Sequence, residues 1–315
     1  MTKNVLITGG AGFIGSHTAD FLLEQGLSVT VLDDLSTGKA ANLNLSSPLL
    51  RFVEGSILDA PLLAKLLRDC DAVLHLAAVA SVQESVENPL HTHAVNAIGF
   101  VQVLQTIREA RRPLRLVYAS SASVYGDPQI LPCTDETPLL AQPLSPYALQ
   151  KIQDEQYAAL YARLFKLNSL GLRYFNVYGS RQDPNSAYSG VISRFIADYK
   201  QNKTLTIYGD GQQSRDFIHV SDVARANWLA LQKDYQGVLN IATGSAETLN
   251  HLISYLEEIG GTKAPFKHTA ARLGDIRASY ATTQQARQRL DFAATVNLRL
   301  GMEELFNSKE VSYAQ

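Results

Sequence analysis

Short apolar runs alternate with longer stretches of mixed polarity over the first 175 residues of the chain. The apolar runs predict strands that are buried on both faces, and the stretches between them carry apolar residues at helical spacing. We expect strands at residues 5–8, 28–32, 51–53, 72–77, 114–119 and 168–174, and helices from 13 onward and at 61–69, 94–110 and 147–165. This alternation predicts a doubly wound α/β fold, in which helices cover both faces of a parallel sheet.

The pattern changes after Tyr174. Residues 176–190 are polar and rich in turn formers, and the short elements that follow do not alternate strictly. We therefore predict two domains: residues 1–175 form the parallel sheet domain, and residues 176–315 form a smaller mixed α/β domain that covers the ligand. Some segments of the second domain, for example 215–231, are expected to return to the sheet.

Composition and charge narrow the class of protein. Of the 315 residues, 46% are hydrophobic and 18% are charged, as is usual for a soluble globular protein, and the net charge of −2 gives no indication of a nucleic-acid or membrane partner. Cys70 and Cys133 form no disulfide framework, and neither they nor the seven histidines show metal-ligand spacing. The chain has neither a signal-peptide core nor an apolar run near the ~20 residues of a membrane span. We expect a cytoplasmic protein without a metal.

A glycine-rich run joins the first predicted strand to the first predicted helix. In Gly9-Gly10-Ala11-Gly12-Phe13-Ile14-Gly15, one glycine serves the tight turn, one lets the backbone approach a pyrophosphate, and one lets the helix pack on the strand. The helix N-terminus then faces the phosphates. Because the run lies between a strand and a helix, it predicts a dinucleotide site of the Rossmann type.

An aspartate ends the second predicted strand. Asp33 lies near the expected distance of ~20 residues beyond the glycines, where a carboxylate accepts hydrogen bonds from the adenosine ribose. The same carboxylate repels a 2′-phosphate, so the sequence favours NAD over NADP. The alternative is a turn aspartate at the end of a strand.

A tyrosine and a lysine are spaced four residues apart in the stretch that begins at Ser145. Pro146 suits the first position of a helix, so Tyr147 and Lys151 lie on one helix face, one turn apart. A phenol ionises only near pH ~10, and a neighbouring ammonium stabilises the phenolate. The pair is a candidate general base with its activator. Such pairs also occur by chance on solvated helices; the glycine-rich run and the upstream serines favour the catalytic interpretation.

Together these motifs resemble the extended short-chain dehydrogenase/reductases, and within them the UDP-sugar 4-epimerases, over essentially the whole chain. The motifs are Thr8-Gly9-Gly10-Ala11-Gly12-Phe13-Ile14-Gly15-Ser16-His17, Ser120-Ser121-Ala122-Ser123-Val124-Tyr125-Gly126, Ser145-Pro146-Tyr147 with Lys151, Leu172-Arg173-Tyr174-Phe175-Asn176-Val177-Tyr178-Gly179 and Arg215-Asp216-Phe217-Ile218-His219-Val220. The run Arg181-Gln182-Asp183-Pro184-Asn185 is similar to the branch that acts on UDP-N-acetylhexosamines.

The resemblance implies a mechanism and a cofactor site. Tyr147 takes the proton of the sugar 4-hydroxyl, Lys151 activates Tyr147 and holds the nicotinamide ribose, and Ser121 hydrogen-bonds the 4-oxygen. Hydride leaves sugar C4 and returns to the opposite face, so NAD stays bound and is regenerated in each cycle. The implied cofactor contacts are Gly9, Gly12, Phe13, Ile14, Gly15, Asp33, Ser56, Ile57, Ala77, Ala78, Asn96, Tyr147, Lys151 and Tyr174. Ser56 departs from the aspartate that the family often has there.

The resemblance also implies how a UDP-sugar binds. Arg215 and Arg272 match diphosphate ligands, a task suited to the guanidinium group, and Tyr208 matches the residue that stacks on uracil. Further implied substrate contacts are Ala80, Ser121, Ala122, Asn176, Gln182, Gly190, Val191, Asp275 and Ser279. Where a bulky tyrosine excludes an N-acetyl group in the family, this chain has the small Ser279. We therefore expect UDP-GlcNAc and UDP-GalNAc to fit, in preference to UDP-Glc and UDP-Gal.

Other functions are possible for this fold. A nucleotide-sugar 4,6-dehydratase carries an Asp-Glu pair where this chain has Ala122 and Ser123, and a reductase would exchange NADPH, against which Asp33 argues. A non-catalytic NAD-binding regulator typically lacks the Tyr/Lys pair. The resemblance further implies a homodimer, paired through the helices at 94–110 and 147–165 unless these faces are simply amphipathic. It also suggests a product used for a bacterial surface or secreted polysaccharide.

Overall fold

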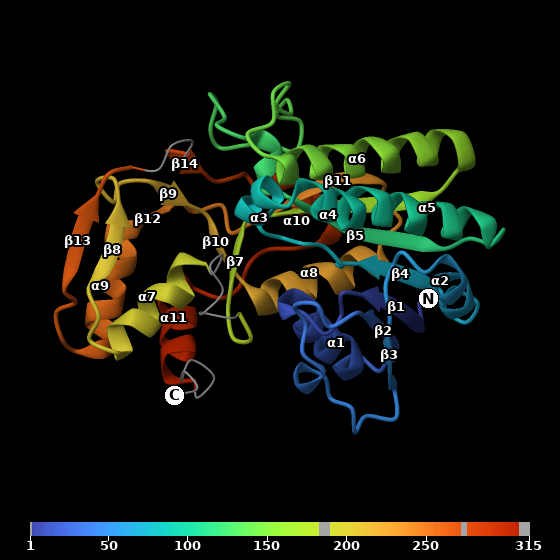
Figure 1. Ribbon diagram of the computed structural model, residues 1–315, viewed down its shortest axis with the longest axis horizontal. Coiled ribbons are helices and arrows are strands. Elements are labelled where there is room, and N and C mark those ends of the chain that lie inside the picture. Colours follow the sequence, from blue (N-terminus) through green and yellow to red (C-terminus); the bar gives the residue numbers. More distant parts are fainter. Residues whose placement is uncertain (1, 183–189, 272–275, 309–315) are drawn as a thin grey trace.

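The computed structural model describes residues 2–182, 190–271 and 276–308. Two lobes lie side by side in Figure 1: a larger one built on a sheet with helices on both faces, and a smaller one that contains α7, α9 and α11.

The larger lobe is organised by one seven-stranded sheet in the order β11-β6-β5-β4-β1-β2-β3, in which every neighbouring pair is parallel. The strands are β1 (Asn4–Thr8), β2 (Ser28–Asp33), β3 (Leu50–Glu54), β4 (Ala72–His75), β5 (Arg115–Ser121), β6 (Asn168–Tyr174) and β11 (Gly237–Ile241). The prediction of a doubly wound parallel sheet is confirmed. Six strands come from the predicted stretches, and the seventh, β11, comes from a much later part of the chain.

Helices cover both faces of this sheet because successive strand residues point in opposite directions. Val5 and Ile7 of β1 face a core formed with α1 (Phe13–Glu24), α8 (Val220–Gln232) and α10 (Gln284–Leu290). Leu6, between them, faces a second core formed with α2 (Ala60–Leu67), α5 (Gly99–Glu109) and α6 (Pro146–Phe165). The apolar runs seen in the sequence are therefore strands buried on both sides.

The predicted helix at 94–110 has a more complex beginning. Two short helices, α3 (Val82–Glu87) and α4 (Pro89–His93), precede a π-helical segment, η2 (Ala94–Ile98), which runs directly into α5. Two short 3-10 segments, η1 (Ala40–Asn42) and η3 (Ala122–Tyr125), follow β2 and β5. π-Helical turns are frequent at functional sites, and this one contains Asn96.

The smaller lobe is held together by its own apolar core. Its helices are α7 (Val191–Lys200), α9 (Leu249–Gly260) and α11 (Leu298–Asn307), which bury Phe195, Leu252 and Met302. Its small sheets pair β7 (Asn176–Tyr178) with β10 (Phe217–His219), β8 (Leu205–Tyr208) with β13 (Phe266–Thr269), and β9 (Ser214–Arg215) with both β12 (Glu247–Thr248) and β14 (Ala278–Ser279).

The chain passes more than once between the lobes. After β10 it forms α8, which packs against α1 with the rings of Phe21 and Trp228 5.9 Å apart, and then adds β11 to the large sheet. The division at residue 175 stays a prediction.

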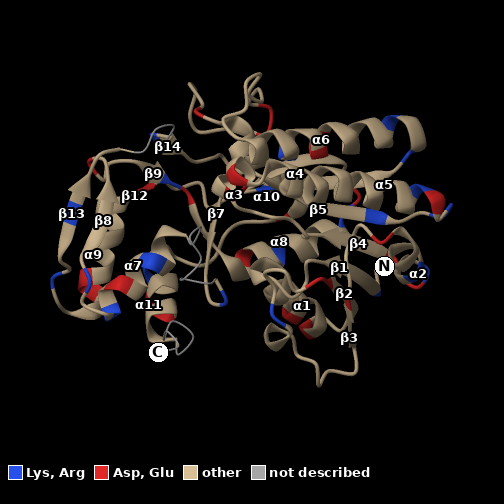
Figure 2. Ribbon diagram, viewed as in Figure 1, with Lys and Arg blue, Asp and Glu red and all other residues tan. Residues whose placement is uncertain are grey.

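Basic and acidic residues are interspersed along the chain in both lobes (Figure 2). Among the described residues, no helix has the length and apolar character needed to cross a bilayer.

Candidate active site

The glycine-rich turn between β1 and α1 is formed by close backbone packing. Gly9 has a φ of +71°, and a Cβ atom on Gly15 would lie 2.1 Å from the Gly9 carbonyl oxygen, so neither position accepts a side chain. A Cβ on Gly12 would meet only that oxygen, at 3.3 Å. Gly12 begins α1 without a side-chain cap, which leaves the helix N-terminus to an outside acceptor. This turn fits the pyrophosphate of a dinucleotide, with Phe13 and Ile14 half-buried in the first turn of α1.

Asp33 connects the end of β2 to the glycine-rich turn. Its Oδ2 accepts a hydrogen bond from the Ala11 N–H at 2.9 Å, and its Oδ1 accepts one from the Leu35 N–H, also at 2.9 Å. Burial raises the pKa of this carboxyl, and the backbone hydrogen bonds oppose the rise. The side chain is therefore fixed in place at the position predicted for the adenosine ribose.

Other predicted cofactor residues follow the carboxyl ends of β3, β4 and β6. Ser56 and the buried Ile57 come after β3, the half-buried Ala77 and Ala78 come after β4, and Tyr174 ends β6. The Ser56 hydroxyl accepts a hydrogen bond from Leu58 N, and the Tyr174 hydroxyl donates one to Asn227 Oδ1 at 2.6 Å. All these positions lie along one edge of the sheet, where ligands of parallel α/β folds bind.

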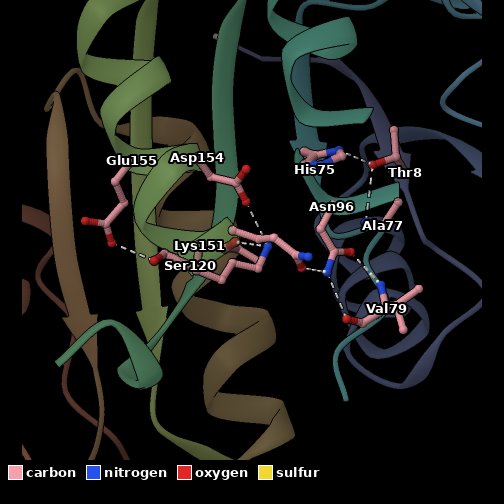
Figure 3. Close-up of polar contacts among 11 residues, drawn as sticks. Thr8, His75, Ala77, Val79, Asn96, Ser120, Lys151, Asp154 and Glu155 are labelled. Carbon is pink, nitrogen blue, oxygen red and sulfur yellow. Dashed lines mark hydrogen bonds and ion pairs between the residues drawn. The ribbon is translucent and has the colours of Figure 1, made fainter. Parts of the chain in front are cut away.

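Asn96 fixes the chain that follows β4. Its Oδ1 accepts from Val79 N at 2.8 Å, and its Nδ2 donates to Val79 O and to Gln150 Oε1 (Figure 3). The side chain of Asn96 is thus used to hold residues 77–80 beside α6, and it links the cofactor edge to the helix that carries Tyr147. Sequence reasoning missed Gln150, whose only signal is its place next to Lys151.

Thr8 and His75 join the ends of β1 and β4. Thr8 Oγ1 accepts from Ala77 N at 3.4 Å and hydrogen-bonds His75 Nδ1 at 2.8 Å (Figure 3). Burial, together with the charge of Lys151, lowers the pKa of His75 to about 3. His75 is therefore a neutral histidine of the core.

Tyr147 and Lys151 lie in the first two turns of α6. The helix begins at Ser145, whose hydroxyl accepts from Ala148 N, followed by Pro146 at its first position. Tyr147 is 9% exposed and Lys151 is 2% exposed, and the Lys151 Nζ atom lies 6.0 Å from the centroid of the tyrosine ring. Lys151 Nζ also donates to Ala119 O at 3.0 Å and to Asp154 Oδ2 at 3.1 Å. The pair can supply a phenol next to a fixed ammonium.

Ser121 ends β5, and its hydroxyl accepts from Ser123 N at 3.2 Å, which starts η3. Since α6 packs against η3, Ser121 and Tyr147 belong to neighbouring elements. Ser120, on the opposite side of the strand, instead donates to Glu155 Oε1 at 2.6 Å (Figure 3). Of the adjacent pair, Ser121 is the one that is left to face the site.

A buried ion pair between Glu155 and Arg173 connects α6 and β6, next to β5. Arg173 of β6 binds both carboxylate oxygens of Glu155, at 2.8 and 2.7 Å, and also donates to the Tyr125 hydroxyl. Glu155 and Arg173 were not predicted as site residues. The sequence offers two signals for them: Glu155 lies one helical turn after Lys151, and Arg173 lies inside an apolar strand. They join β5, β6 and α6 into one rigid unit.

Three of the predicted substrate residues lie on two of the small sheets, which are linked by backbone hydrogen bonds. Ser279 of β14 lies opposite Arg215 of β9 in register, and the Ser279 carbonyl accepts from Asp216 N at 2.9 Å. The Asp216 carbonyl in turn accepts from Asn176 N and Nδ2, at 3.0 and 3.2 Å. Arg215 donates to Ser214 O at 2.9 Å.

Four further substrate positions lie around the start of α7 and the end of β8. Gln182 donates to Val177 O and accepts from the Ser193 hydroxyl at 2.6 Å, and a Cβ on Gly190 would meet the Gln182 amide at 2.9 Å. Val191 begins α7 and is half-buried, as is Tyr208 at the end of β8.

The remaining substrate predictions are Ala80, Ala122, Arg272 and Asp275. Ala80 follows β4 and is exposed, and Ala122 is half-buried in η3. Arg272, Asp275 and the run 183–185 lie outside the described residues. Within the described ranges, no three His, Cys, Asp or Glu side chains gather as a metal site.

Comparison with known proteins identifies the family. The model of the NAD dependent epimerase/dehydratase family matches residues 5–242. A putative UDP-glucose 4-epimerase of Methanocaldococcus jannaschii is 38% identical over 305 residues, which are 96% of this chain and 97% of the relative. The chain therefore belongs to the NAD dependent epimerase/dehydratase family, and NAD is its cofactor.

Two solved structures share the fold over nearly the whole chain. The UDP-N-acetylglucosamine 4-epimerase from Methanobrevibacter ruminantium M1, in complex with UDP-N-acetylmuramic acid, is 37% identical with a TM-score of 0.92, and the match covers 96% of this chain and 97% of that one. The UDP-glucose 4-epimerase of Thermus thermophilus, in complex with NAD, is 33% identical with a TM-score of 0.88, and the match covers 96% of this chain and 98% of that one.

Proposed function

We propose that this protein is an NAD-dependent UDP-sugar 4-epimerase that interconverts UDP-GlcNAc and UDP-GalNAc, and UDP-Glc and UDP-Gal less readily. The observation that carries the proposal is the buried Tyr147 with the Lys151 ammonium 6.0 Å from its ring, at the carboxyl edge of an NAD-binding sheet. The names of the relatives support the reaction class, since both UDP-glucose and UDP-N-acetylglucosamine 4-epimerases are among them.

Three side chains carry the proton chemistry. NAD, when bound, would supply the hydride acceptor and donor that inversion at sugar C4 requires. Tyr147 accepts the 4-hydroxyl proton as the C4–H bond breaks and donates it back as the bond re-forms. Lys151 stabilises the phenolate, and Ser121 hydrogen-bonds the 4-oxygen and fixes its distance from Tyr147. No proton is lost or gained over the cycle, which agrees with an isomerisation.

The nucleotide is held while the sugar turns. Arg215, with its counterpart Arg272, binds the diphosphate, because a guanidinium offers several donors in one plane to phosphate oxygens. Tyr208 stacks on the uracil, and Asn176 and Asp275 complete the nucleotide contacts. Because the contacts are made mainly to the UDP group, the sugar can rotate and present either face to the nicotinamide ring.

The size of the sugar pocket favours the N-acetylated substrates. Ser279, next to Arg215 in the small sheet, leaves space at the C2 substituent, and Ala80, Ala122 and Gly190 are also small. The amide of Gln182 is fixed by hydrogen bonds to Val177 O and from the Ser193 hydroxyl, so it would present a polar group to the sugar.

The proposal includes a homodimer. Large apolar side chains are exposed on α3, α4, η2 and α6: they include Val86, Leu90, Ile98, Leu149 and Leu164, of which Leu90 is 87% exposed. A four-helix contact between two copies would cover them.

The direct test is a proton NMR time course with purified protein and UDP-GlcNAc, without added NAD. We expect the UDP-GalNAc anomeric signal to grow to a constant ratio, which the reverse reaction from UDP-GalNAc also reaches. No interconversion of any of the four UDP-sugars would contradict the proposal, and conversion of UDP-Glc alone would contradict its N-acetyl part.

A further inference from the structure

The ammonium of Lys151 lies in a buried environment, which disfavours its positive charge. Its side chain is 3% exposed, on the buried side of α6, and two of its three donors are used by Ala119 O and Asp154 Oδ2 (Figure 3). Burial of this kind favours the neutral amine, because a charge loses its hydration there. A nearby negative charge must offset that effect if Lys151 is to stabilise a phenolate.

Asp154 is the residue in direct contact that supplies this charge. It is 2% exposed, one oxygen accepts from Lys151 at 3.1 Å, and the other, Oδ1, has no hydrogen-bond partner in the described part of the chain. Burial lowers the pKa of Lys151, and the Asp154 carboxylate is the largest of the groups that oppose it; together with Tyr147 and Glu155 it leaves the net pKa of Lys151 raised. Burial raises the pKa of Asp154 to about 7, against the pull of Lys151. Above neutral pH both members of the pair are charged.

The other titratable groups around the pair do not replace Asp154. Glu155, the next acidic side chain, is held by the bidentate ion pair with Arg173 of β6. His75 of β4 is kept neutral because burial lowers its pKa, and Tyr118 of β5 stays protonated because burial raises its pKa well above the usual value. Tyr147 is the remaining group that acts on Lys151, and it is the group to be activated.

We propose that Asp154 is a positioning residue for the catalytic base: its carboxylate keeps the buried Lys151 amine protonated and holds it beside Tyr147. The importance of Asp154 for turnover rests on the proposed function. The electrostatic coupling between Asp154 and Lys151 does not. A buried ion pair with an unpaired carboxylate oxygen adds little to the free energy of folding. Its position next to Tyr147 therefore indicates a role in catalysis rather than in stability.

The coupling is tested without turnover, through the pH dependence of unfolding. In Asp154→Asn the folded-state pKa of Lys151 falls below its unfolded value, so the unfolded chain binds more protons than the folded one. The unfolding equilibrium constant of the variant, relative to wild type, should then fall by up to about tenfold per pH unit as pH rises from about 7.5 to about 10. Denaturant titrations at several pH values measure this slope.

Asp222→Asn is the matched control. Asp222 is as buried as Asp154 and pairs with Arg225 at the same i,i+3 spacing, at 2.8 Å. A guanidinium stays protonated when it loses its partner, so between about pH 7.5 and pH 10 this variant should lose stability by the same amount at each pH, without a change of slope. Should Asp154→Asn alone not fold, the double variant Asp154→Asn/Lys151→Met decides, because removing both charges restores folding if the unpaired ammonium is the cause.

The second readout is the pH dependence of kcat. In Asp154→Asn the basic limb should move to lower pH by about two units or more, because Lys151 loses its proton there, and Asp154→Glu should restore it in part. Two results would overturn the proposal. One is an Asp154→Asn variant whose unfolding equilibrium depends on pH as in wild type; the other is a variant whose unfolding depends more steeply on pH but whose kcat has the wild-type pH profile. A wild-type protein that is inactive on every UDP-sugar contradicts the proposed function instead, and the unfolding slopes still decide whether Asp154 keeps Lys151 protonated.

Discussion

Lys151 lies one helical turn after Tyr147 on α6, with its Nζ atom 6.0 Å from the centroid of the tyrosine ring. Replacing Tyr147 with Phe removes the hydroxyl and keeps the ring. We expect kcat to fall by roughly 10²–10⁴, the usual contribution of a general base, while UDP-sugar binding measured by calorimetry is retained. Tyr157→Phe is the control, since Tyr157 lies on the same helix but is 41% exposed. A Tyr147→Phe variant with wild-type turnover would show that the base lies elsewhere.

The glycine-rich turn offers a test of NAD binding that separates fold from function. A Cβ on Gly12 meets only the Gly9 carbonyl oxygen at 3.3 Å, so Gly12→Ala should change the free energy of unfolding by no more than about 1 kcal/mol. The same methyl group should occupy the place of the pyrophosphate, so the purified variant should carry little NAD, measured by chromatography after denaturation.

Gly15→Ala is the contrasting variant, because its Cβ would lie 2.1 Å from the same oxygen and 2.7 Å from Gly10 Cα. We expect this protein to be strongly destabilised or insoluble. If Gly12→Ala retained a full complement of NAD, the cofactor would not approach the backbone at this turn.

Sugar choice is tested at Ser279, which lies opposite Arg215 in register. Ser279→Tyr fills the proposed space for the N-acetyl group, so kcat/KM should fall much more for UDP-GlcNAc than for UDP-Glc. Ala278→Tyr is the control, because adjacent strand residues point to opposite faces. Equal losses on both substrates in Ser279→Tyr would mean that this position does not select the sugar.

Acid should destabilise the large sheet through His75. Its pKa is lowered to about 3 from 6.5 by burial, so between these values the unfolded chain binds a proton that the folded protein excludes. The contribution of His75 to the free energy of unfolding is fully present above pH ~6.5 and is lost as pH falls. At pH ~5 this loss amounts to ~2 kcal/mol.

His75→Asn keeps a neutral hydrogen-bonding group beside Thr8 and should flatten the dependence between about pH 5 and pH 7. Urea titrations across this range measure it. A variant with the same pH dependence as wild type would show that His75 is not the group responsible.

Much of this fold follows from the sequence because the strands are apolar runs and the glycine-rich turn has a strict geometry. Strands β1 to β6 arise from the predicted stretches. Strand β11 was not predicted, since Gly237–Ile241 follows a stretch without regular alternation. Its place beside β6 depends on tertiary packing that no local pattern encodes.

The candidate site was predicted less completely. Tyr147, Lys151 and the glycines are recognisable because a fixed spacing gives each its geometry. Asp154 and Gln150 are not, because a polar residue in a helix is usually solvated. Only the tertiary packing of α6 shows that both are buried, Gln150 against Thr92 of α4 and Asn96 of η2. The roles of the individual site residues remain predictions that the variants above test.

The central claim is that the configuration at sugar C4 is inverted by hydride removal and return. The most direct measurement uses UDP-GlcNAc carrying deuterium at C4, incubated with the protein in ordinary water and followed by NMR and mass spectrometry. We predict UDP-GalNAc that retains the deuterium at C4, because the hydride never exchanges with solvent. Product with a solvent proton at C4 would contradict the account.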